Sequence, residues 1–335
     1  MRLSILDQSP VSSGHTAGEA LQESMKLAQL GEALGYTRYW IAEHHDIAGL
    51  SCSAPEVMLG YIGAHTKTIR IGSGAVLLPN YKPYKVAETY NLLATLFPGR
   101  IDLGIGRAPG GSAEASLALT DNFLGQVRKM PESVQELLHF LHNDTPADHM
   151  YASLSASPVP AVPPVPWILG TSEKSAVLAA ENGMAYAFGH FMSDREGPAI
   201  LQSYRKKYQA STRQQQPATI VAVSVICAET TEQAEELALS ANLWQIQLAK
   251  GEATTGIPSI EEAKQYPFTP EDAAVTLERK KKMVVGNPKE VAQQLRELQA
   301  LYQADELMLV TITHSYEARL RSYQLIADEI LMKRG

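Results

Sequence analysis

Short runs of hydrophobic residues alternate with longer amphipathic stretches along almost the whole chain. The short runs contain few polar residues, which is typical of parallel strands that are buried on both faces. The longer stretches repeat apolar positions every three or four residues, as helices do when one face packs on a sheet. This alternation predicts eight strand–helix units. The predicted strands are Leu3–Asp7, Arg38–Ala42, Ile69–Leu78, Ile101–Gly106, Trp167–Gly170, Ala185–Phe188, Ile220–Ala228 and Glu306–Thr311.

Helix start signals support the same division of the chain. Ser53 to Glu56 has the spacing of a capping box with an early proline, and Asn287 to Glu290 orders a cap residue, a proline and a glutamate. These two signals predict helix starts near residues 54 and 287. The other predicted helices cover residues 21–34, 86–97, 122–142, 175–182, 199–208, 235–249 and 316–332.

Eight units of this kind predict a (β/α)8 TIM barrel, with residues 1–335 forming a single domain. Two connections are longer than the others. Residues 146–166 are rich in proline and are expected to form an extended surface loop, and residues 250–285 form a second insertion. Because such barrels place their active sites at the carboxyl ends of the strands, candidate residues are expected just after each strand.

Composition and charge favour a globular enzyme. Hydrophobic residues make up 45% of the chain, and 29 Lys and Arg against 36 Asp and Glu give a net charge of -7. No dense basic run offers a footprint for nucleic acid or an anionic membrane, and the run 279–282 is interpreted as a solvated helix face. Two distant cysteines, Cys52 and Cys227, cannot form a disulfide framework. We therefore expect a cytoplasmic protein that acts on a small molecule.

Glu43, His44 and His45 follow directly after the predicted strand Arg38–Ala42. A histidine at a barrel mouth is a plausible general acid or base, because its ordinary pKa lies near physiological pH. A metal site is a weaker alternative, because the ends of the other strands supply no comparable set of His or Cys residues. Ordinary hydrogen-bonded loop residues are the third interpretation.

The predicted strand Ile101–Gly106 alternates large apolar residues with Asp102, Gly104 and Gly106. The period of two turns these three residues toward the barrel interior and leaves Arg107 at the rim, where its guanidinium suits an anion. Glycines at such positions are explained either by a flat ligand across the barrel mouth or by tight packing of a barrel layer. The spacing alone leaves both explanations open.

Thr171, Ser172 and Ser175 follow the predicted strand Trp167–Gly170, at the start of the next helix. Free backbone N–H groups and hydroxyls at a helix N-terminus form a suitable site for a phosphate. The alternative is ordinary helix capping by Thr171 or Ser172. Together with Arg107, this turn is a candidate site for the phosphate of a cofactor.

Four segments carry a resemblance to a known family. They are WIAEHH at 40–45, IGSGAVLLP at 71–79, NLLATLFPGRIDLGIGR at 91–107 and VVGNPKEVAQQL at 284–295. In these segments the chain resembles the bacterial luciferase-like flavin-dependent monooxygenases. The resemblance implies a (β/α)8 barrel that binds reduced FMN, often supplied by a separate flavin reductase. It also implies that the reduced flavin captures dioxygen as a peroxyflavin, which attacks a small organic substrate.

The same resemblance assigns roles to residues at the barrel mouth. His44 matches the family's catalytic histidine, and Glu43 and His45 match its neighbours. Arg107 matches the arginine that binds the phosphate, with Ser172 and Ser175 at the matched phosphate turn.

Two further positions concern the flavin ring. Gly74-Ala75 matches the place where the family often has a non-proline cis peptide under the ring. Gly106 stands where true luciferases have a reactive cysteine, so the resemblance does not imply light emission.

The family also generally forms dimers, which predicts a homodimer through Pro55–His65 and Val86–Leu96. Two alternatives to an FMN-dependent monooxygenase stay open. One is a deazaflavin-dependent oxidoreductase that transfers a hydride, and the other is a flavin-binding protein without catalytic activity. The sequence does not identify the substrate.

Overall fold

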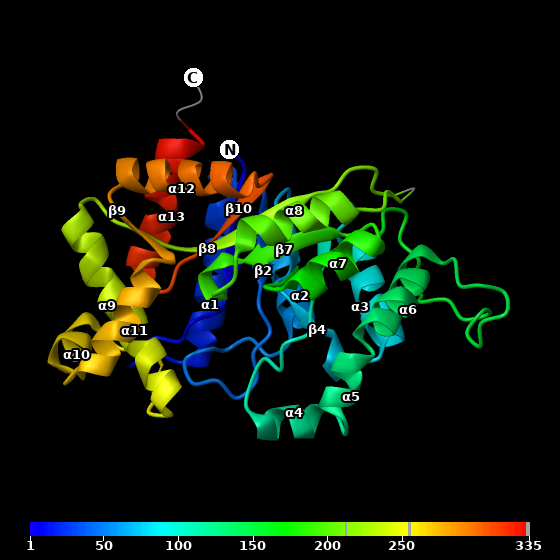
Figure 1. Ribbon diagram of the computed structural model, residues 1–335, viewed down its shortest axis with the longest axis horizontal. Coiled ribbons are helices and arrows are strands. Elements are labelled where there is room, and N and C mark those ends of the chain that lie inside the picture. Colours follow the sequence, from blue (N-terminus) through cyan, green and yellow to red (C-terminus); the bar gives the residue numbers. More distant parts are fainter. Residues whose placement is uncertain (212, 254–255, 333–335) are drawn as a thin grey trace.

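Eight parallel strands close into a barrel in the computed structural model, which describes residues 1–211, 213–253 and 256–332. Each strand pairs with the next, and the last strand pairs with both the first and β8, which closes the ring. The predicted barrel is therefore confirmed (Figure 1). Its strands are β1 (Leu3–Asp7), β2 (Arg38–Ile41), β3 (Arg70–Ser73), β5 (Ile101–Gly106), β6 (Val165–Gly170), β7 (Ala185–Gly189), β8 (Thr219–Cys227) and β10 (Glu306–Val310).

Two short strands lie outside this ring. The sequence predicts one strand over Ile69–Leu78, but the structure divides it into β3 and β4 (Val76–Leu77), which both pair with β5. The sequence also misses β9 (Met283–Gly286), which it assigns to the end of the second insertion. The first half of β8 pairs with β10 and closes the barrel, whereas its last residues pair with β9.

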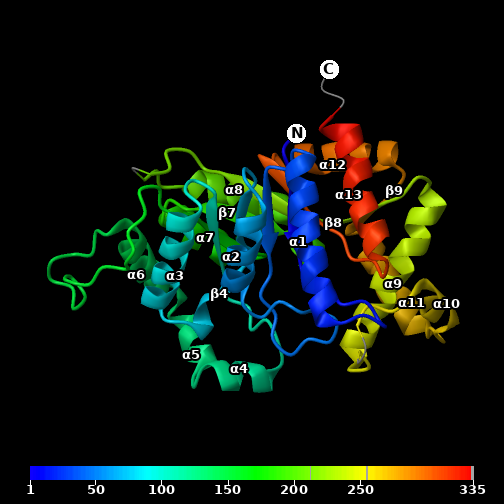
Figure 2. The same ribbon diagram turned by 180° about the vertical axis from the view of Figure 1, so that it is seen from behind.

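Helices surround the barrel on its outside (Figure 2). The described residues form α1 (Ala17–Ala33), α2 (Pro55–His65), α3 (Pro83–Leu96), α6 (Met130–His142), α7 (Glu173–Glu181), α8 (Gly197–Lys207), α9 (Thr231–Lys250), α12 (Pro288–Tyr302) and α13 (Tyr316–Ile330). They also form α4 (Ala113–Leu119), α5 (Phe123–Arg128), α10 (Ile260–Gln265) and α11 (Pro270–Lys280), with short 3-10 helices at Leu78–Asn80 and His190–Met192.

Several helix predictions need correction. The single helix predicted over 122–142 is two helices, α5 and α6, which meet at Lys129. The side chain of Ser53 does not cap α2, because Ala54 occupies the N-cap position and Pro55 is the first helical residue. Asn287 does cap α12 as predicted, since its side chain accepts hydrogen bonds from two backbone N–H groups.

The two insertions differ from each other. Residues 143–164 form no helix or strand and extend away from the barrel at the edge of both views (Figures 1 and 2). The second insertion is expected as a loop over 250–285, but its described residues include α10, α11 and most of β9. Residues 254 and 255 of this insertion lie outside the described residues.

Successive side chains of each strand point in turn to the helices outside the barrel and to the barrel interior, because side chains alternate with a period of two. Leu3 and Ile5 belong to the large core between the barrel and its helices. Leu6 belongs to a smaller cluster inside the barrel, together with Trp40 and Trp167, whose rings meet edge to face. The core therefore leaves little open space inside the barrel at the level of these rings.

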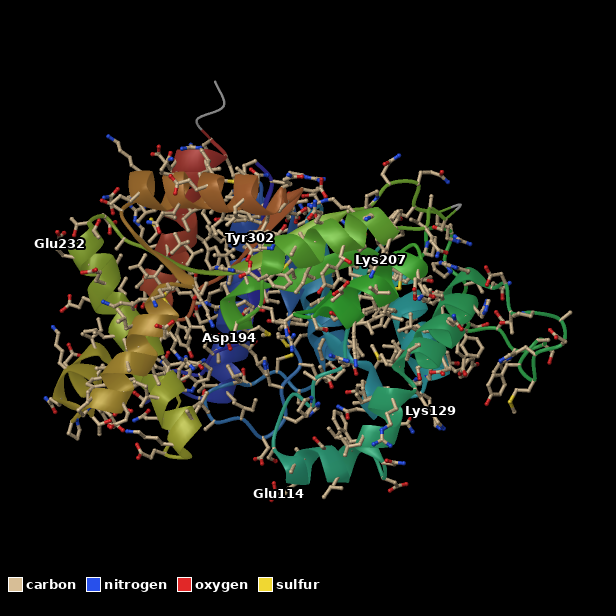
Figure 3. The ribbon with its side chains drawn as sticks, in the orientation of Figure 1. Glu114, Lys129, Asp194, Lys207, Glu232 and Tyr302 are labelled. Atoms are coloured by element: carbon tan, nitrogen blue, oxygen red, sulfur yellow. The ribbon has the colours of Figure 1, made fainter. Side chains whose placement is uncertain are left out.

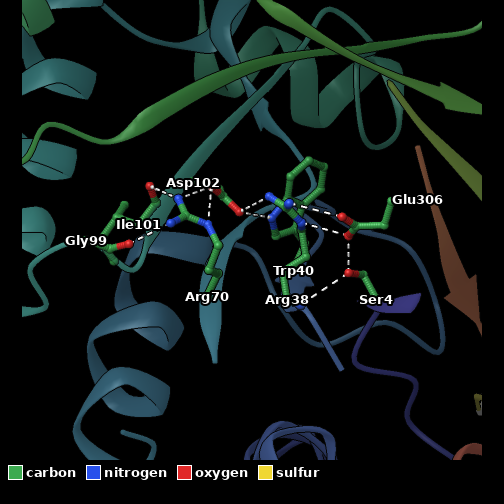
Figure 4. A network of polar contacts seen from close by, with 8 residues as sticks. All are labelled: Ser4, Arg38, Trp40, Arg70, Gly99, Ile101, Asp102 and Glu306. Carbon is green, nitrogen blue, oxygen red and sulfur yellow. Dashed lines mark hydrogen bonds and ion pairs between the residues drawn. The ribbon is translucent and has the colours of Figure 1, made fainter. Parts of the chain in front are cut away.

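Below these rings, buried charges fill the amino-terminal end of the barrel (Figure 4). The guanidinium of Arg38 contacts a carboxylate oxygen of Asp102 at 2.7 Å and one of Glu306 at 2.8 Å. Arg70 donates a second set of hydrogen bonds to Asp102, one of them from Nε at 3.1 Å. Burial alone would lower the pKa of Arg38, but the two carboxylates outweigh it and raise the pKa above its ordinary value.

Replacing Arg38 by methionine is expected to lower the free energy of unfolding by about 3–5 kcal/mol, because it leaves two buried carboxylates without their cation. Chemical denaturation at neutral pH measures this change. The matched control is Arg321→Met, which removes an exposed ion pair with Glu229 and is expected to cost less than about 1 kcal/mol. Equal losses in the two variants would contradict the structural importance of the network.

Candidate active site

A cavity of about 380 Å³ lies at the carboxyl ends of the barrel strands. All of the site residues predicted from the sequence line it, with the exception of His45. Its walls also contain apolar side chains from the strands, from α5 and from the 3-10 helix His190–Met192, including Leu6, Trp40, Leu77, Phe123, Leu124, Val127, Leu169, Phe188, Phe191 and Met192. A mostly apolar cavity with a few convergent polar groups is the usual form of a cofactor or ligand site.

Glu43 joins the end of β2 to the neighbouring loops. Its buried carboxylate accepts hydrogen bonds from the backbone N–H of Leu77 at 3.0 Å and from the hydroxyl of Tyr81 at 2.9 Å. The Nε2 atom of His45 lies 2.7 Å from the same carboxylate. Burial raises the pKa of Glu43 above its ordinary value, although these contacts oppose the shift. The carboxylate therefore holds His45 and the residues after the Gly74-Ala75 bond in fixed positions.

His44 lies between Glu43 and His45 in the sequence, and it lines the cavity. Burial, together with the adjacent His45, lowers the pKa of His44 to about 4. Its Nδ1 atom is buried and has no hydrogen-bond partner among the described residues. At neutral pH the imidazole, which lines the cavity, is therefore uncharged.

The floor of the cavity is formed by residues without large side chains. The peptide bond between Gly74 and Ala75 is cis, as the family resemblance predicts. Gly106 lines the cavity beside Ala75, but Gly104 does not. A Cβ atom on Gly104 would lie only 2.1 Å from the carbonyl oxygen of Ser73, so tight packing of the barrel layer explains that glycine.

The loop before α7 brings the predicted phosphate residues together. Ser172 is the N-cap of α7, and its hydroxyl accepts a hydrogen bond from Arg107 at 3.4 Å. Arg107 is exposed and makes no ion pair with a carboxylate among the described residues. Thr171 and Ser175 complete the turn. An exposed cation and several hydroxyls therefore converge on a helix N-terminus, where an anion is favoured.

Sequence reasoning missed two contributions to this cavity. Tyr186 supports the phosphate turn from below, because its hydroxyl lies 3.0 Å from the hydroxyl of Ser175. Burial raises the pKa of Tyr186 to about 12, so the hydroxyl stays protonated. The other contribution is the apolar side of α5, which includes Phe123 and Val127. Their spacing of four residues indicates a helix, but the sequence predicts one long helix over 122–142 and therefore misses this short one.

A second cavity of about 700 Å³ adjoins the first. Gln8, His44, Phe191 and Met192 line both cavities, so the two spaces meet at these side chains. Most of the other walls of the second cavity come from β8, β9, α9 and α11, with further residues from the loop after β2 and from the end of β10. It thus lies between the barrel and the described part of the second insertion.

Two searches of the described residues gave negative results. No group of three or more His, Cys, Asp or Glu side chains is arranged to hold a metal ion. No helix in the same residues is both long and apolar enough to span a bilayer.

Comparisons with known proteins identify the family of this chain. The family model for luciferase-like monooxygenases matches residues 1–304. The uncharacterised protein YceB of Bacillus subtilis (strain 168) is 45% identical over 331 residues, which cover 99% of this chain and 100% of YceB. The N-acetyl-S-alkylcysteine monooxygenase of the same organism is 38% identical over 99% of this chain and 98% of its own.

A solved structure shows the same architecture. The crystal structure of apo-MsnO8 superposes with a TM-score of 0.91 at 34% identity and covers 99% of both chains. The chain therefore belongs to the luciferase-like monooxygenase family and is a flavin-dependent oxidoreductase.

The low pKa of His44 predicts a loss of stability in acid. The folded protein resists protonation of His44 until about pH 4, whereas the unfolded chain takes up the proton near pH 6.5. The stability that the neutral imidazole contributes is therefore lost as the pH falls from 6.5 to 4, by on the order of 3 kcal/mol. Urea unfolding of the wild type and His44→Gln over this range measures the difference. Parallel pH dependences of the two proteins would contradict the prediction.

Proposed function

We propose that the protein is an FMN-dependent monooxygenase that uses reduced FMN and dioxygen to oxidise a small organic substrate. The observation that carries this proposal is the single cavity that brings together His44, the Gly74-Ala75 floor and the Arg107–Ser172 turn. These groups come from separate barrel strands, yet they line one space of a size usual for a cofactor.

The residues present fit FMN by their chemistry. The guanidinium of Arg107, the hydroxyls of Thr171, Ser172 and Ser175, and the N-terminus of α7 would hold the phosphate. Gly106 and the Gly74-Ala75 bond leave room for a flat ring against the floor of the cavity. Bound reduced flavin would supply the electrons with which dioxygen is activated.

The residues of the chain itself then act in three ways. The neutral imidazole of His44, which lines the cavity, can exchange a proton with the reacting groups. Glu43 and His45 keep the end of β2 in place by the contacts described above. Phe191 and the apolar residues of α5 exclude water, which protects reactive species from unproductive decay.

A supply of reduced flavin implies a partner. We infer that a separate flavin reductase provides it and that the reaction takes place in the cytoplasm. The 38% identical relative is named as a monooxygenase of N-acetyl-S-alkylcysteine, so an organic molecule of similar size is a reasonable starting point for a substrate search.

Anaerobic titration with reduced FMN tests the cofactor assignment. We expect saturable binding by the wild type, and about 10- to 100-fold weaker binding by Arg107→Gln because a charge-assisted contact to the phosphate is lost. Reduced riboflavin lacks the phosphate, so the same substitution is expected to leave its affinity unchanged. Equal weakening for both flavins would contradict the assignment of Arg107.

Mixing the reduced complex with aerated buffer in a stopped-flow instrument tests the reaction with dioxygen. We expect a lag before the absorbance of oxidised flavin appears, compared with free reduced FMN. Oxidation without a lag, together with tighter binding of reduced deazaflavin, would instead support hydride transfer. Binding without any turnover in a reductase-coupled assay would support a binding protein.

We also infer a homodimer through α2 and α3, which lie side by side on the outside of the barrel (Figure 2). These helices expose a group of large apolar side chains. Val57 on α2 is 68% exposed, and Leu92 and Leu96 on α3 are 49% and 59% exposed. Apolar side chains gathered on neighbouring helices are typical of a subunit interface.

The double variant Leu92→Glu, Leu96→Glu is therefore expected to have the mass of one chain in light scattering, whereas the wild type has the mass of two. Four buried carboxylates in the symmetric interface would oppose association. Leu301→Glu on α12 is the matched control, since Leu301 is 61% exposed and lies on a different helix. A dimer that survives in the double variant would contradict this interface.

A further inference from the structure

The second cavity has a polar wall that the binding of FMN leaves unused. Among the residues that line it are Arg279 and Lys282 of the basic run, which the sequence interprets as a solvated helix face. The structure corrects this interpretation for these two residues, because both are partly buried and line a cavity. Figure 3 labels Asp194, which also lines the cavity and pairs with Lys282.

Arg279 is the cation of this wall that has no acidic partner. Lys282 pairs with Asp194, and Glu278 pairs with Lys281, which does not line the cavity. No ion pair or side-chain hydrogen bond joins Arg279 to any described residue. Burial lowers the pKa of Arg279 from its ordinary value, and no carboxylate opposes the shift. A partly buried cation without a partner is costly, so its position in a cavity wall points to an anionic ligand.

Two amides in the same walls also have no partner. Asn242 on α9 is 5% exposed and Gln8 after β1 is 9% exposed, and neither side chain forms a hydrogen bond with another described residue. Buried amides are normally hydrogen-bonded, and these two reach only the cavity. They therefore offer donors and acceptors to a ligand in the same cavity as the cation.

The remaining lining makes the cavity suitable for an organic molecule and not only for an inorganic ion. Apolar side chains come from the loop after β2, from α9 and from β10 and the residues that follow it. They are Ile47, Leu50, Leu248, Val310 and Ile312. Because His44 lines both cavities, a molecule bound here adjoins the proposed reaction centre.

We propose that the second cavity is the substrate compartment and that it selects organic carboxylates, whose negative charge pairs with Arg279 while an apolar part lies against the remaining wall. Asn242 and Gln8 bind further polar groups of the same molecule. This inference rests on the proposed function for its link to the flavin, but the anion site itself can be tested without any flavin.

Isothermal titration calorimetry on the full-length, flavin-free protein tests the site with matched pairs of probes. The pairs are octanoate with octanamide, and N-acetylphenylalanine with its primary amide. We expect each acid to bind at least about tenfold more tightly than its amide, because only the acid forms a charge-assisted contact. Arg279→Gln is expected to abolish this preference, and Arg279→Lys is expected to retain part of it.

Lys280→Gln is the matched control, since Lys280 is the next residue on α11, is exposed and does not line the cavity. It is expected to keep the full preference for acids. Acids that bind no better than amides, or a preference that survives Arg279→Gln, would overturn the proposal. If Arg107→Gln abolished the preference for acids and Arg279→Gln did not, the anion would bind at the phosphate turn, and the proposal would again be overturned.

Titration of the same proteins with FMN separates the two proposals. We expect Arg279→Gln to bind FMN as the wild type does, because Arg279 does not line the first cavity. Failure of the wild type to bind FMN would overturn the proposed function, whereas the comparison of acids with amides would still decide the anion site.

Discussion

The cation of Arg38, held between two carboxylates inside the barrel, is the constraint on which the site depends. Asp102 comes from β5 and Glu306 from β10, so one guanidinium joins strands on different sides of the ring. Its Cζ atom also lies 4.9 Å from the centre of the Trp167 ring, which covers it. Because charges and indole rings fill the amino-terminal end, the open space of the barrel is confined to the carboxyl ends of the strands. Both carboxylates depend on the same guanidinium, so a substitution of Arg38 would leave two buried charges without this cation.

Two cavities with different chemistry meet at His44. The first offers an anion site on a helix N-terminus and a floor of small residues, and the second offers Arg279 and unpartnered amides. His44 lines both, and burial lowers its pKa to about 4, so that it is uncharged at neutral pH. A neutral imidazole can donate or accept a hydrogen bond without bringing a net charge next to the anions proposed for the two cavities. Glu43 supports this arrangement from behind, since its three contacts hold the end of β2.

The barrel and the first cavity could be predicted from the sequence because both follow from local patterns. Continuous apolar runs located all eight barrel strands, and residues directly after strands had to lie at the same end. The second cavity could not be predicted, because its lining depends on how β9 and α11 return to the barrel. Arg279 in particular has the same local sequence whether its helix faces water or a cavity. The pairing of β9 with the end of β8 determines where the helix lies. A strand of only four residues carries no clear periodic signal from which this long-range pairing could be predicted.

The division of β8 into two halves has a consequence for how such an enzyme can diversify. One half belongs to the closed ring, and the other carries β9 and the insertion beyond the rim. The insertion is thus attached to the barrel by backbone pairing, which does not depend on the side chains of α11. Sequence changes on α11 can therefore alter the lining of the second cavity while the ring, its buried charges and the Arg107–Ser172 turn stay as they are. The fold thus separates the barrel and its first cavity from an insertion that supplies part of the wall of the second cavity.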